Sequence, residues 1–317
     1  MTVADVGEFG LIAEIRALVA PDGTAVVGIG DDAAVLSAPD GRTVVSTDLL
    51  VEGRHFRRDW SSAADIGVKA AAQNLADVAA MGAAPTALLL GLAVPGDTTV
   101  AWVLELTGGL LAECQRAGAV LAGGDVTSAD TVMLGITAIG DLAGRPPVTR
   151  SGARPGDVVA VSALPGRSAA GLALLAAGLD PAGGERADLV AAHRRPQPDY
   201  PAGVMAAAAG ATSMIDVSDG LIADLGHVAA ASRVSIDISS PSLADERLAT
   251  AAEVLRADWR GWALRGGEDH VLAASFPSES HVPARWTVVG QVREGNGVLV
   301  DSQPWHGRGG WDHFHPR

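Results

Sequence analysis

The sequence predicts a mixed α/β (α+β) protein of two domains. At 317 residues the chain exceeds the size of one ordinary hydrophobic core. Strand-like runs alternate with helical patterns through the first half, which is typical of α/β and α+β folds. A segment rich in Gly and Pro, from Gly144 to Gly156, then interrupts the pattern. We therefore expect a boundary near residue 150, with domains 1–148 and 149–317.

In the first domain, apolar residues at helical spacing predict helices over Ser62–Met81 and Thr98–Ala117. Short apolar runs predict the strands Ala25–Ile29, Arg42–Ser46, Ala87–Val94 and Thr131–Asp141. The uncharged run 78–96 is long enough to suggest a membrane span, but Gly82 and Pro85 divide it into a helix end, a turn and a strand.

The second domain restarts with a predicted strand, Asp157–Ser162, and continues with alternating elements. The expected helices are Ser168–Gly178, Ala187–Arg194, Pro201–Ala209 and Leu221–Ala231. The remaining expected strands are Met214–Ile215, Val234–Ile238, His270–Ala274, Thr287–Val292 and Val298–Val300.

Composition and charge restrict the function. The formal net charge of −14 argues against nucleic acid or an anionic membrane as a partner, because both are bound by basic patches. Cys114 is the only cysteine, which excludes an intrachain disulfide, and its helical context favours a buried thiol over a nucleophile. The first residues lack a basic segment followed by an apolar one, so we expect no signal peptide and a cytoplasmic location.

Acidic side chains stand beside glycine or small polar residues in several short segments, where strands or helices are expected to end. They are Gly28–Asp32, Ser46–Asp48, Asn74–Asp77, Gly123–Asp125 and Asp216–Gly220. Carboxylates brought close together need cations, and hard oxygen ligands suit Mg²⁺, which usually bridges protein carboxylates to substrate phosphates. The pattern favours a metal-dependent phosphoryl-transfer enzyme.

Each segment also has a purely structural interpretation. Ser46, Thr47 and Asp48 would suit a helix N-cap, and so would Ser218 or Asp219 ahead of the helix at Leu221. Asp77 is different, because it shares a face with Asn74 on a mostly apolar helix. A carboxylate buried there costs several kcal/mol unless it is paired or metal-bound.

The chain contains a partial match to one nucleotide-site motif and lacks another. Gly28-Ile29-Gly30-Asp31-Asp32-Ala33 fits the dinucleotide fingerprint, with Asp48 as a downstream acid, but adjacent aspartates repel a pyrophosphate. A P-loop is excluded, since Lys69 is the only lysine. Arginine must therefore supply any positive clamp on a phosphate, and Arg150, beside the proposed hinge, is best placed.

Taken together, the ordered motifs resemble the thiamine-monophosphate kinase family. The resemblance runs from Gly7-Glu8-Phe9 to Gly310-Trp311-Asp312-His313-Phe314 and covers nearly the whole chain. The most specific segments are Gly28–Asp32, Ser46–Phe56, Asn74–Ala83, Gly123–Thr127, Thr149–Ala153, Asp216–Leu221 and Gly266–Asp269. It implies the two-domain fold of the aminoimidazole ribonucleotide synthetase-like superfamily. In that fold the first domain binds metal and ATP and pairs through its sheet in a homodimer, and the second completes the ATP and substrate site.

The resemblance also implies a reaction and a set of site residues. The reaction is the ATP- and Mg²⁺-dependent conversion of thiamine monophosphate to thiamine diphosphate by direct in-line transfer. The implied metal-binding residues are Asp32, Ser46, Thr47, Asp48, Asp77, Asp125, Asp216 and Asp219. The implied ATP contacts are Gly124, Asp125, Arg150 and Ser218, and the implied substrate contacts are His55, Glu268 and Trp311. Many relatives carry a tyrosine near Ala117, and its absence leaves the adenine contact unassigned.

Other functions remain open at this point. Aminoimidazole ribonucleotide synthetase shares the implied fold but uses an acceptor that is not a phosphate. A non-catalytic binder of Mg²⁺-nucleotide or thiamine phosphate, and a nicotinamide oxidoreductase, belong to different functional classes. Selenophosphate synthetase and the hydrogenase-maturation relative are disfavoured, because each requires a cysteine at a position where this chain has none.

Overall fold

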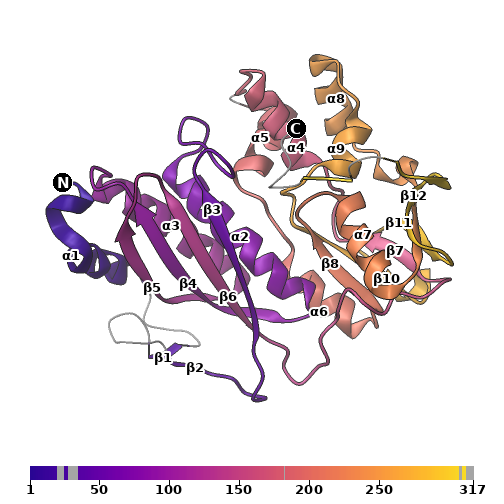
Figure 1. Cartoon of the computed structure of the whole chain (residues 1–317), viewed down its shortest axis with the longest axis horizontal. Helices are drawn as coiled ribbons and strands as arrows, with labels where there is room; N and C mark the ends of the chain where they lie inside the picture. The colour runs from indigo at the N-terminus through magenta and orange to yellow at the C-terminus, as the bar shows by residue number, and fades with distance from the viewer. Residues whose placement is uncertain (20–24, 28–34, 182, 307–308, 312–317) are drawn as a thin grey trace. The chain divides into compact units, whose positions relative to one another are not determined.

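The computed structural model describes residues 1–19, 25–27, 35–181, 183–306 and 309–311. The chain divides into two compact units, of which the first comprises 1–78 and 83–145 and the second 79–82 and 146–317. Each unit contains its own sheet together with several helices (Figure 1). Within the described part of the chain, no helix combines the length and apolar character needed to cross a membrane.

The first unit is built on a four-stranded sheet with the order β3-β6-β4-β5. The strands are β3 (Val44–Val51), β4 (Ala84–Val94), β5 (Val120–Ser128) and β6 (Met133–Asp141). Its helices are α1 (Val3–Leu18), α2 (Ala63–Ala80) and α3 (Val100–Ala117), and the short strands β1 (Ala25–Val27) and β2 (Val35–Leu36) form a separate pair. The predicted α2 and α3 are confirmed to within two residues at each end, whereas α1 was not predicted.

Helices α2 and α3 cross at very short range. A Cβ atom on Gly67 would lie 1.9 Å from the carbonyl oxygen of Leu106, and one on Gly109 would lie 2.1 Å from that of Ala64. Such distances allow no side chain larger than hydrogen. Thr99 caps α3 by accepting the N–H of Trp102, and α3 ends at Gly118 in the left-handed conformation. Cys114 on α3 is buried, as predicted.

Two strands of this sheet are longer than the sequence predicts. β3 continues to Val51, so Ser46, Thr47 and Asp48 lie inside a strand, and the predictions that they follow its end or cap a helix are wrong. β5 likewise includes Gly123, Gly124 and Asp125. Side chains of β3 alternate between half-buried and exposed positions as far as Leu49, so a run of three polar residues does not end the strand.

The second unit contains a seven-stranded sheet in the order β13-β12-β9-β11-β7-β10-β8. Its strands are β7 (Val158–Val161), β8 (Ser213–Val217), β9 (Ser235–Ile238), β10 (Val271–Phe276), β11 (Thr287–Arg293), β12 (Gly297–Val300) and β13 (Gln303–Pro304). Its helices are α4 (Arg167–Ala176), α5 (Glu185–Arg194), α6 (Tyr200–Ala208), α7 (Leu221–Ser232), α8 (Glu246–Leu255) and α9 (Trp259–Arg265). Every residue of β7 to β10 is buried, because both faces of the central sheet are covered.

Candidate functional site

The first unit carries a polar cluster between β3 and α2, made of Ser46, Asp48, Gln73, Asn74 and Asp77. The Ser46 hydroxyl donates to Oδ2 of Asp77 at 2.7 Å. The Asp48 N–H donates to Oδ1 of Asn74 at 3.1 Å, and the Gln73 amide donates to Oδ2 of Asp48 at 3.4 Å. Asp77, which the apolar character of α2 singled out, is thus paired with a hydroxyl. The β3–α2 cluster presents hydroxyl, amide and carboxylate oxygens at one place.

The other two predicted metal ligands of this sheet lie on its opposite face. Thr47 alternates with Ser46 and Asp48, and its hydroxyl donates to the carbonyl of Ile136 at 2.9 Å. Asp125 on β5 lies opposite Gly91 on β4. The same cross-strand row of residues continues through Gly135 on β6 to Leu49 on β3. Asp48 belongs to the neighbouring row, and three strand spacings separate β3 from β5, or about 14 Å. Within one chain, therefore, Asp125 does not join the β3–α2 cluster.

Close packing against β4 explains why the residue before Asp125, Gly124, is a glycine. A Cβ atom at this position would lie 2.0 Å from the carbonyl oxygen of Leu90 on the neighbouring strand. The close backbone approach expected from the paired glycines is therefore present, and its partner in the structure is β4. The predicted contact of Gly124 with ATP stays a prediction.

His55 lies in the turn that follows β3. Its Nδ1 accepts the N–H of Val51 at 3.0 Å, and its carbonyl accepts from the Lys69 ammonium at 3.0 Å. Because Nδ1 is an acceptor, the ring proton of a neutral His55 is on Nε2. The only lysine of the chain is buried and supports this turn.

The second unit carries an acidic cluster where β8 leads into α7, made of Asp216, Asp219 and Asp224 together with His270. Asp224 was not predicted; it accepts the N–H groups of Asp219 and Gly220 through Oδ2, at 3.1 and 3.0 Å. Burial, and then the negative charges of Asp216 and Asp219, raise the pKa of Asp224 to about 7. His270 Nδ1 lies 3.3 Å from Oδ2 of Asp216. The β8–α7 cluster therefore concentrates negative charge at one place.

Glu268 lies on the loop between α9 and β10, beside this cluster. Both Glu268 and His270 adopt the left-handed backbone conformation, with φ of 63° and 53°. Non-glycine residues occupy this region rarely, and such strain concentrates at functional sites. The Glu268 N–H donates to the carbonyl of Ser218 at 2.7 Å, which ties the loop to the segment that contains Asp219.

Arg150, Ser218 and Trp311 are also placed in the second unit. Arg150 is exposed, and its carbonyl accepts from the Ser232 hydroxyl at 3.0 Å. The Trp311 N–H donates to the carbonyl of Asp219 at 2.9 Å, and 40% of Trp311 is exposed. Asp32 lies outside the described residues, as do Gly28–Asp31 and Asp312–Phe314.

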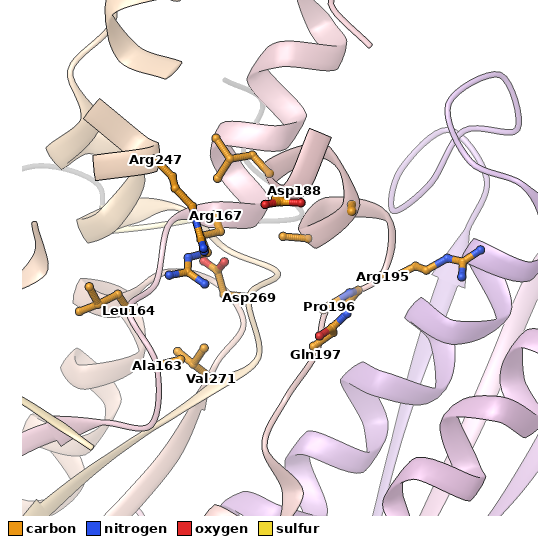
Figure 2. A pocket seen from close by; sticks show the side chains of 13 residues that line it. Ala163, Leu164, Arg167, Asp188, Arg195, Pro196, Gln197, Arg247, Asp269 and Val271 are labelled. Carbon is orange, nitrogen blue, oxygen red and sulfur yellow. The ribbon is translucent and has the colours of Figure 1, made fainter. Parts of the chain in front are cut away.

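A pocket of about 290 Å³ adjoins the Glu268 loop, since Asp269 forms part of its wall. Figure 2 shows Arg167, Arg247 and Asp269 gathered at one side of it, with Arg195 directed away. Arg167 is paired with Asp245 at 2.9 Å. Sequence reasoning did not find this pocket, because its walls come from α4, α5, α8 and β10.

The oxygen donors of the β3–α2 and β8–α7 clusters suit a hard cation such as Mg²⁺, but they do not form a complete coordination shell. Among the described residues, no three His, Cys, Asp or Glu side chains are grouped closely enough to hold a metal. Mg²⁺ usually keeps several waters and binds one or two carboxylates plus substrate phosphates. Small groups of carboxylates that leave the shell incomplete fit that mode of binding, whereas they do not fit a site made of protein ligands alone.

Comparison with known proteins identifies the family. Residues 30–142 match the family described as AIR synthase related protein, N-terminal domain. Over 316 residues, 99% of this chain and 93% of the relative, the sequence is 48% identical to thiamine-monophosphate kinase of Mycobacterium tuberculosis (strain ATCC 25618 / H37Rv). The chain belongs to the thiamine-monophosphate kinase family.

Solved structures of this family agree with that assignment. The thiamine-monophosphate kinase of Stenotrophomonas maltophilia K279a is 34% identical, with a TM-score of 0.83 over 95% of this chain and 98% of that one. The structure named AaThiL complexed with AMPPCP and TMP is 32% identical, with a TM-score of 0.82 over 99% of both chains. The predicted fold class and the prediction of an enzyme of the kinase class are confirmed.

The nicotinamide oxidoreductase hypothesis fails on topology. A dinucleotide fingerprint requires a strand, a helix that starts within the glycine motif, and a parallel neighbouring strand. Here the strand ahead of the motif, β1, pairs antiparallel with β2, and Ala25 lies opposite Leu36.

Proposed function

We propose that this protein phosphorylates thiamine monophosphate to thiamine diphosphate, with ATP as the phosphoryl donor. The observation that carries the proposal is full-length similarity to thiamine-monophosphate kinases, at 48% identity over 99% of the chain. A relative of the same fold is described as complexed with AMPPCP and TMP. The two acidic clusters support it. The reaction brings together two anionic phosphates, which need cations between them, and carboxylates can hold such cations.

The residues proposed to hold Mg²⁺ carry hard oxygen donors. They are Asp32, Ser46, Thr47, Asp48, Asp77, Asp125, Asp216 and Asp219. When bound, Mg²⁺ would reduce the repulsion between the two substrates and offset charge on the transferring group. Thr47 and Asp125 would serve from the face of the sheet opposite Asp48 and Asp77.

The acceptor explains why the proposed site needs no strong general base. Its nucleophile is an oxygen of a phosphate monoester, whose second pKa is about 6, so it is largely ionised at neutral pH. The chain then has to position the reactants for in-line transfer. We propose that Gly124, Asp125, Arg150 and Ser218 contact ATP, and that His55, Glu268 and Trp311 contact thiamine monophosphate. Arg150 and Trp311 are both exposed, which supports such contacts.

We include a homodimer in the proposal. β3 and β5 are the two edge strands of the first unit's sheet, and edge strands offer unpaired backbone groups to another chain. Val45 and Leu49 on β3 are 60% and 58% exposed, and Met133 on β6 is 37% exposed. Pairing of β3 with β5 of a second copy would satisfy these backbone groups. It would also bring the partner subunit's Asp125 toward Asp48, which Asp125 of the same chain does not approach.

The test is to incubate the purified protein with ATP, Mg²⁺ and thiamine monophosphate, and to separate the products by chromatography. We expect thiamine diphosphate and ADP in equal amounts, and none of either after chelation of the metal. ADP without thiamine diphosphate would demand another acceptor. Neither product, with binding detected by calorimetry, would favour a non-catalytic binder. A cytoplasmic location stays a prediction from the sequence.

A further inference from the structure

A buried histidine, His193, contacts the carboxylate of Glu268. Its Nδ1 lies 3.4 Å from Oε2 of Glu268. The histidine is on the last turn of α5, 75 positions before Glu268 in the sequence. Only 8% of the His193 side chain is exposed, against 30% of the Glu268 side chain. Glu268 therefore reaches the surface, whereas His193 stands behind it.

The chemistry of this contact determines where the ring proton lies. An ionised carboxylate only accepts hydrogen bonds, so the contact is favourable when Nδ1 of His193 carries a proton. The Ser168 hydroxyl lies 3.1 Å from the same nitrogen, and its oxygen can act as a second acceptor. With a proton on Nδ1, the imidazole is a donor aimed at Glu268.

The position of His193 is itself fixed by tight packing of α4 against α5. A Cβ atom on Gly171 of α4 would lie 2.1 Å from the carbonyl of Leu189 and 3.1 Å from Cβ of His193. Ser168, in the first turn of α4, is 1% exposed and donates its N–H to Asp269 at 2.9 Å. Asp269 also accepts the N–H of Gly166 at 2.6 Å.

The α4–α5 pair thus holds two neighbouring residues of the strained loop. Asp269 is bound by the N-terminus of α4, and the carboxylate of Glu268 is contacted from α5. These interactions hold the loop at a residue in the left-handed region, a conformation that costs a non-glycine residue about 1–3 kcal/mol. A carboxylate held in one orientation loses less freedom when it binds a ligand.

We propose that His193 is a positioning residue for Glu268, which it orients through a proton on Nδ1 toward the organic part of the substrate. This inference rests on the proposed function, in which Glu268 contacts thiamine monophosphate. The parts of that substrate suited to a carboxylate are its cationic thiazolium ring and its aminopyrimidine, since the phosphate is an anion. His193 acts only through Glu268 and does not touch ATP.

The kinetic test compares His193→Ala, His193→Asn and His193→Gln in the full chain. Asparagine places an amide N–H near the position of Nδ1, whereas glutamine places it near Nε2. We expect KM for thiamine monophosphate to rise roughly tenfold in the Ala and Gln variants and to stay within about twofold in the Asn variant. KM for ATP is expected to be unchanged in all of them. His227→Gln, at an exposed histidine of α7, is the matched control.

A purely structural role for His193 predicts a different outcome. Loss of packing would lower the unfolding temperature and the amount of active enzyme, with equal effects of Asn and Gln and no selective change in KM. Equal KM values in the Asn and Gln variants would overturn the proposal. Glu268→Gln distinguishes a failure of the positioning role of His193 from a failure of the proposed function. If Glu268→Gln raises KM for thiamine monophosphate and His193→Ala does not, the positioning role fails while the proposed function stands.

A second measurement is independent of the reaction. Nitrogen-15 NMR of the imidazole rings, with the His193 signals assigned by their loss in His193→Gln, reports which ring nitrogen is protonated. We expect a protonated Nδ1 at neutral pH, and a change of this signal in Glu268→Gln. An unprotonated Nδ1 would overturn the positioning role even if thiamine monophosphate proved not to be the acceptor.

Discussion

The hydroxyl of Ser46 donates a 2.7 Å hydrogen bond to Oδ2 of Asp77, which joins the edge strand β3 to helix α2. The same strand donates the N–H of Asp48 to Asn74, one helical turn before Asp77. Oxygens from a strand and a helix are thereby held at one point by the backbone of both elements. This arrangement is the basis of the first prediction.

Asp77→Asn is expected to reduce turnover about 10- to 100-fold and to raise the Mg²⁺ concentration needed for half-maximal rate. The asparagine oxygen can still accept from Ser46, so the unfolding temperature should change little. ADP release measured across a range of Mg²⁺ concentrations checks both effects. Asp130→Asn, at an exposed aspartate of the same unit, is the control. Near-normal activity of Asp77→Asn and Asp125→Asn at saturating Mg²⁺ would contradict the assignment of these residues.

The separation of Asp125 from Asp48 predicts that inactive variants complement each other. If the two residues act in one site formed across a dimer, Asp48→Asn and Asp125→Asn homodimers are each inactive. A mixed dimer contains one site with both aspartates intact, so random subunit exchange should restore about a quarter of the wild-type activity. The measurement is the rate of ADP release after the two proteins are mixed under conditions that permit exchange.

Absence of activity in the mixture of the two variants would contradict this prediction. If both aspartates act in a site formed by one chain, no mixture regains activity. Leu49→Glu on the exposed face of β3 provides a second check, because a charge at a buried dimer contact is costly. Its sedimentation as a monomer, with loss of activity, would agree with the proposed interface.

The crossing of α2 and α3 predicts opposite effects of two glycine substitutions. Gly67→Ala places a methyl group against the carbonyl of Leu106 and should destabilise the first unit by about 1–3 kcal/mol. Gly108→Ala, on the exposed side of α3 with no atom within 4 Å, should be neutral or stabilise by up to about 1 kcal/mol. Urea unfolding of both variants is the measurement. Equal stability of the two would argue against so close a helix crossing.

Cys114 should be unreactive in the folded protein. Burial, and then the charge of Glu113, raise the pKa of its thiol to about 12, and the thiolate is the reactive form. We expect labelling by a thiol reagent at pH 8 to be negligible until urea unfolds the first unit. Rapid labelling under native conditions would mean that α3 opens locally, and a hydrogen-exchange measurement on α3 would then show weak protection.

The buried carboxylate of Asp269 predicts a specific dependence of stability on pH. Burial raises the pKa of Asp269 to about 6, despite the N–H groups of Ser168 and Gly166, from an ordinary value of 3.8. Between these values the folded state binds more protons than the unfolded state, so this group's contribution to stability decreases as pH rises from about 4 to about 6. The full difference is about 3 kcal/mol.

This contribution is isolated by comparing the wild type with Asp269→Asn. The free energy of unfolding, measured in urea at several pH values between 4.5 and 7.5, should fall more steeply with rising pH in the wild type. Groups common to both proteins cancel in the difference. Parallel curves would show that Asp269 does not titrate in this range in the folded protein.

Much of the candidate chemistry could be predicted from the sequence. The acidic, oxygen-rich segments indicated a metal-dependent phosphoryl-transfer enzyme, and helices α2 and α3 followed from apolar periodicity. Local signals were also present for elements that were missed. Asp245 and Asp258 each cap the following helix, α8 and α9, through the N–H two residues on. Such capping residues could have located both helices.

What the sequence by itself determined is the kind of side chain available, helices α2 and α3, and the family. Which side chains meet was decided only by the tertiary structure. Ser46 and Asp48 are separated from Thr47 because β3 runs on to Val51 and its side chains alternate between faces. Asp125 falls in the row of Leu49 because of the register across β6 and β4, and His193 reaches Glu268 because α4 packs against α5. Strand register and helix packing depend on contacts between residues far apart in the chain, and no local pattern encodes them.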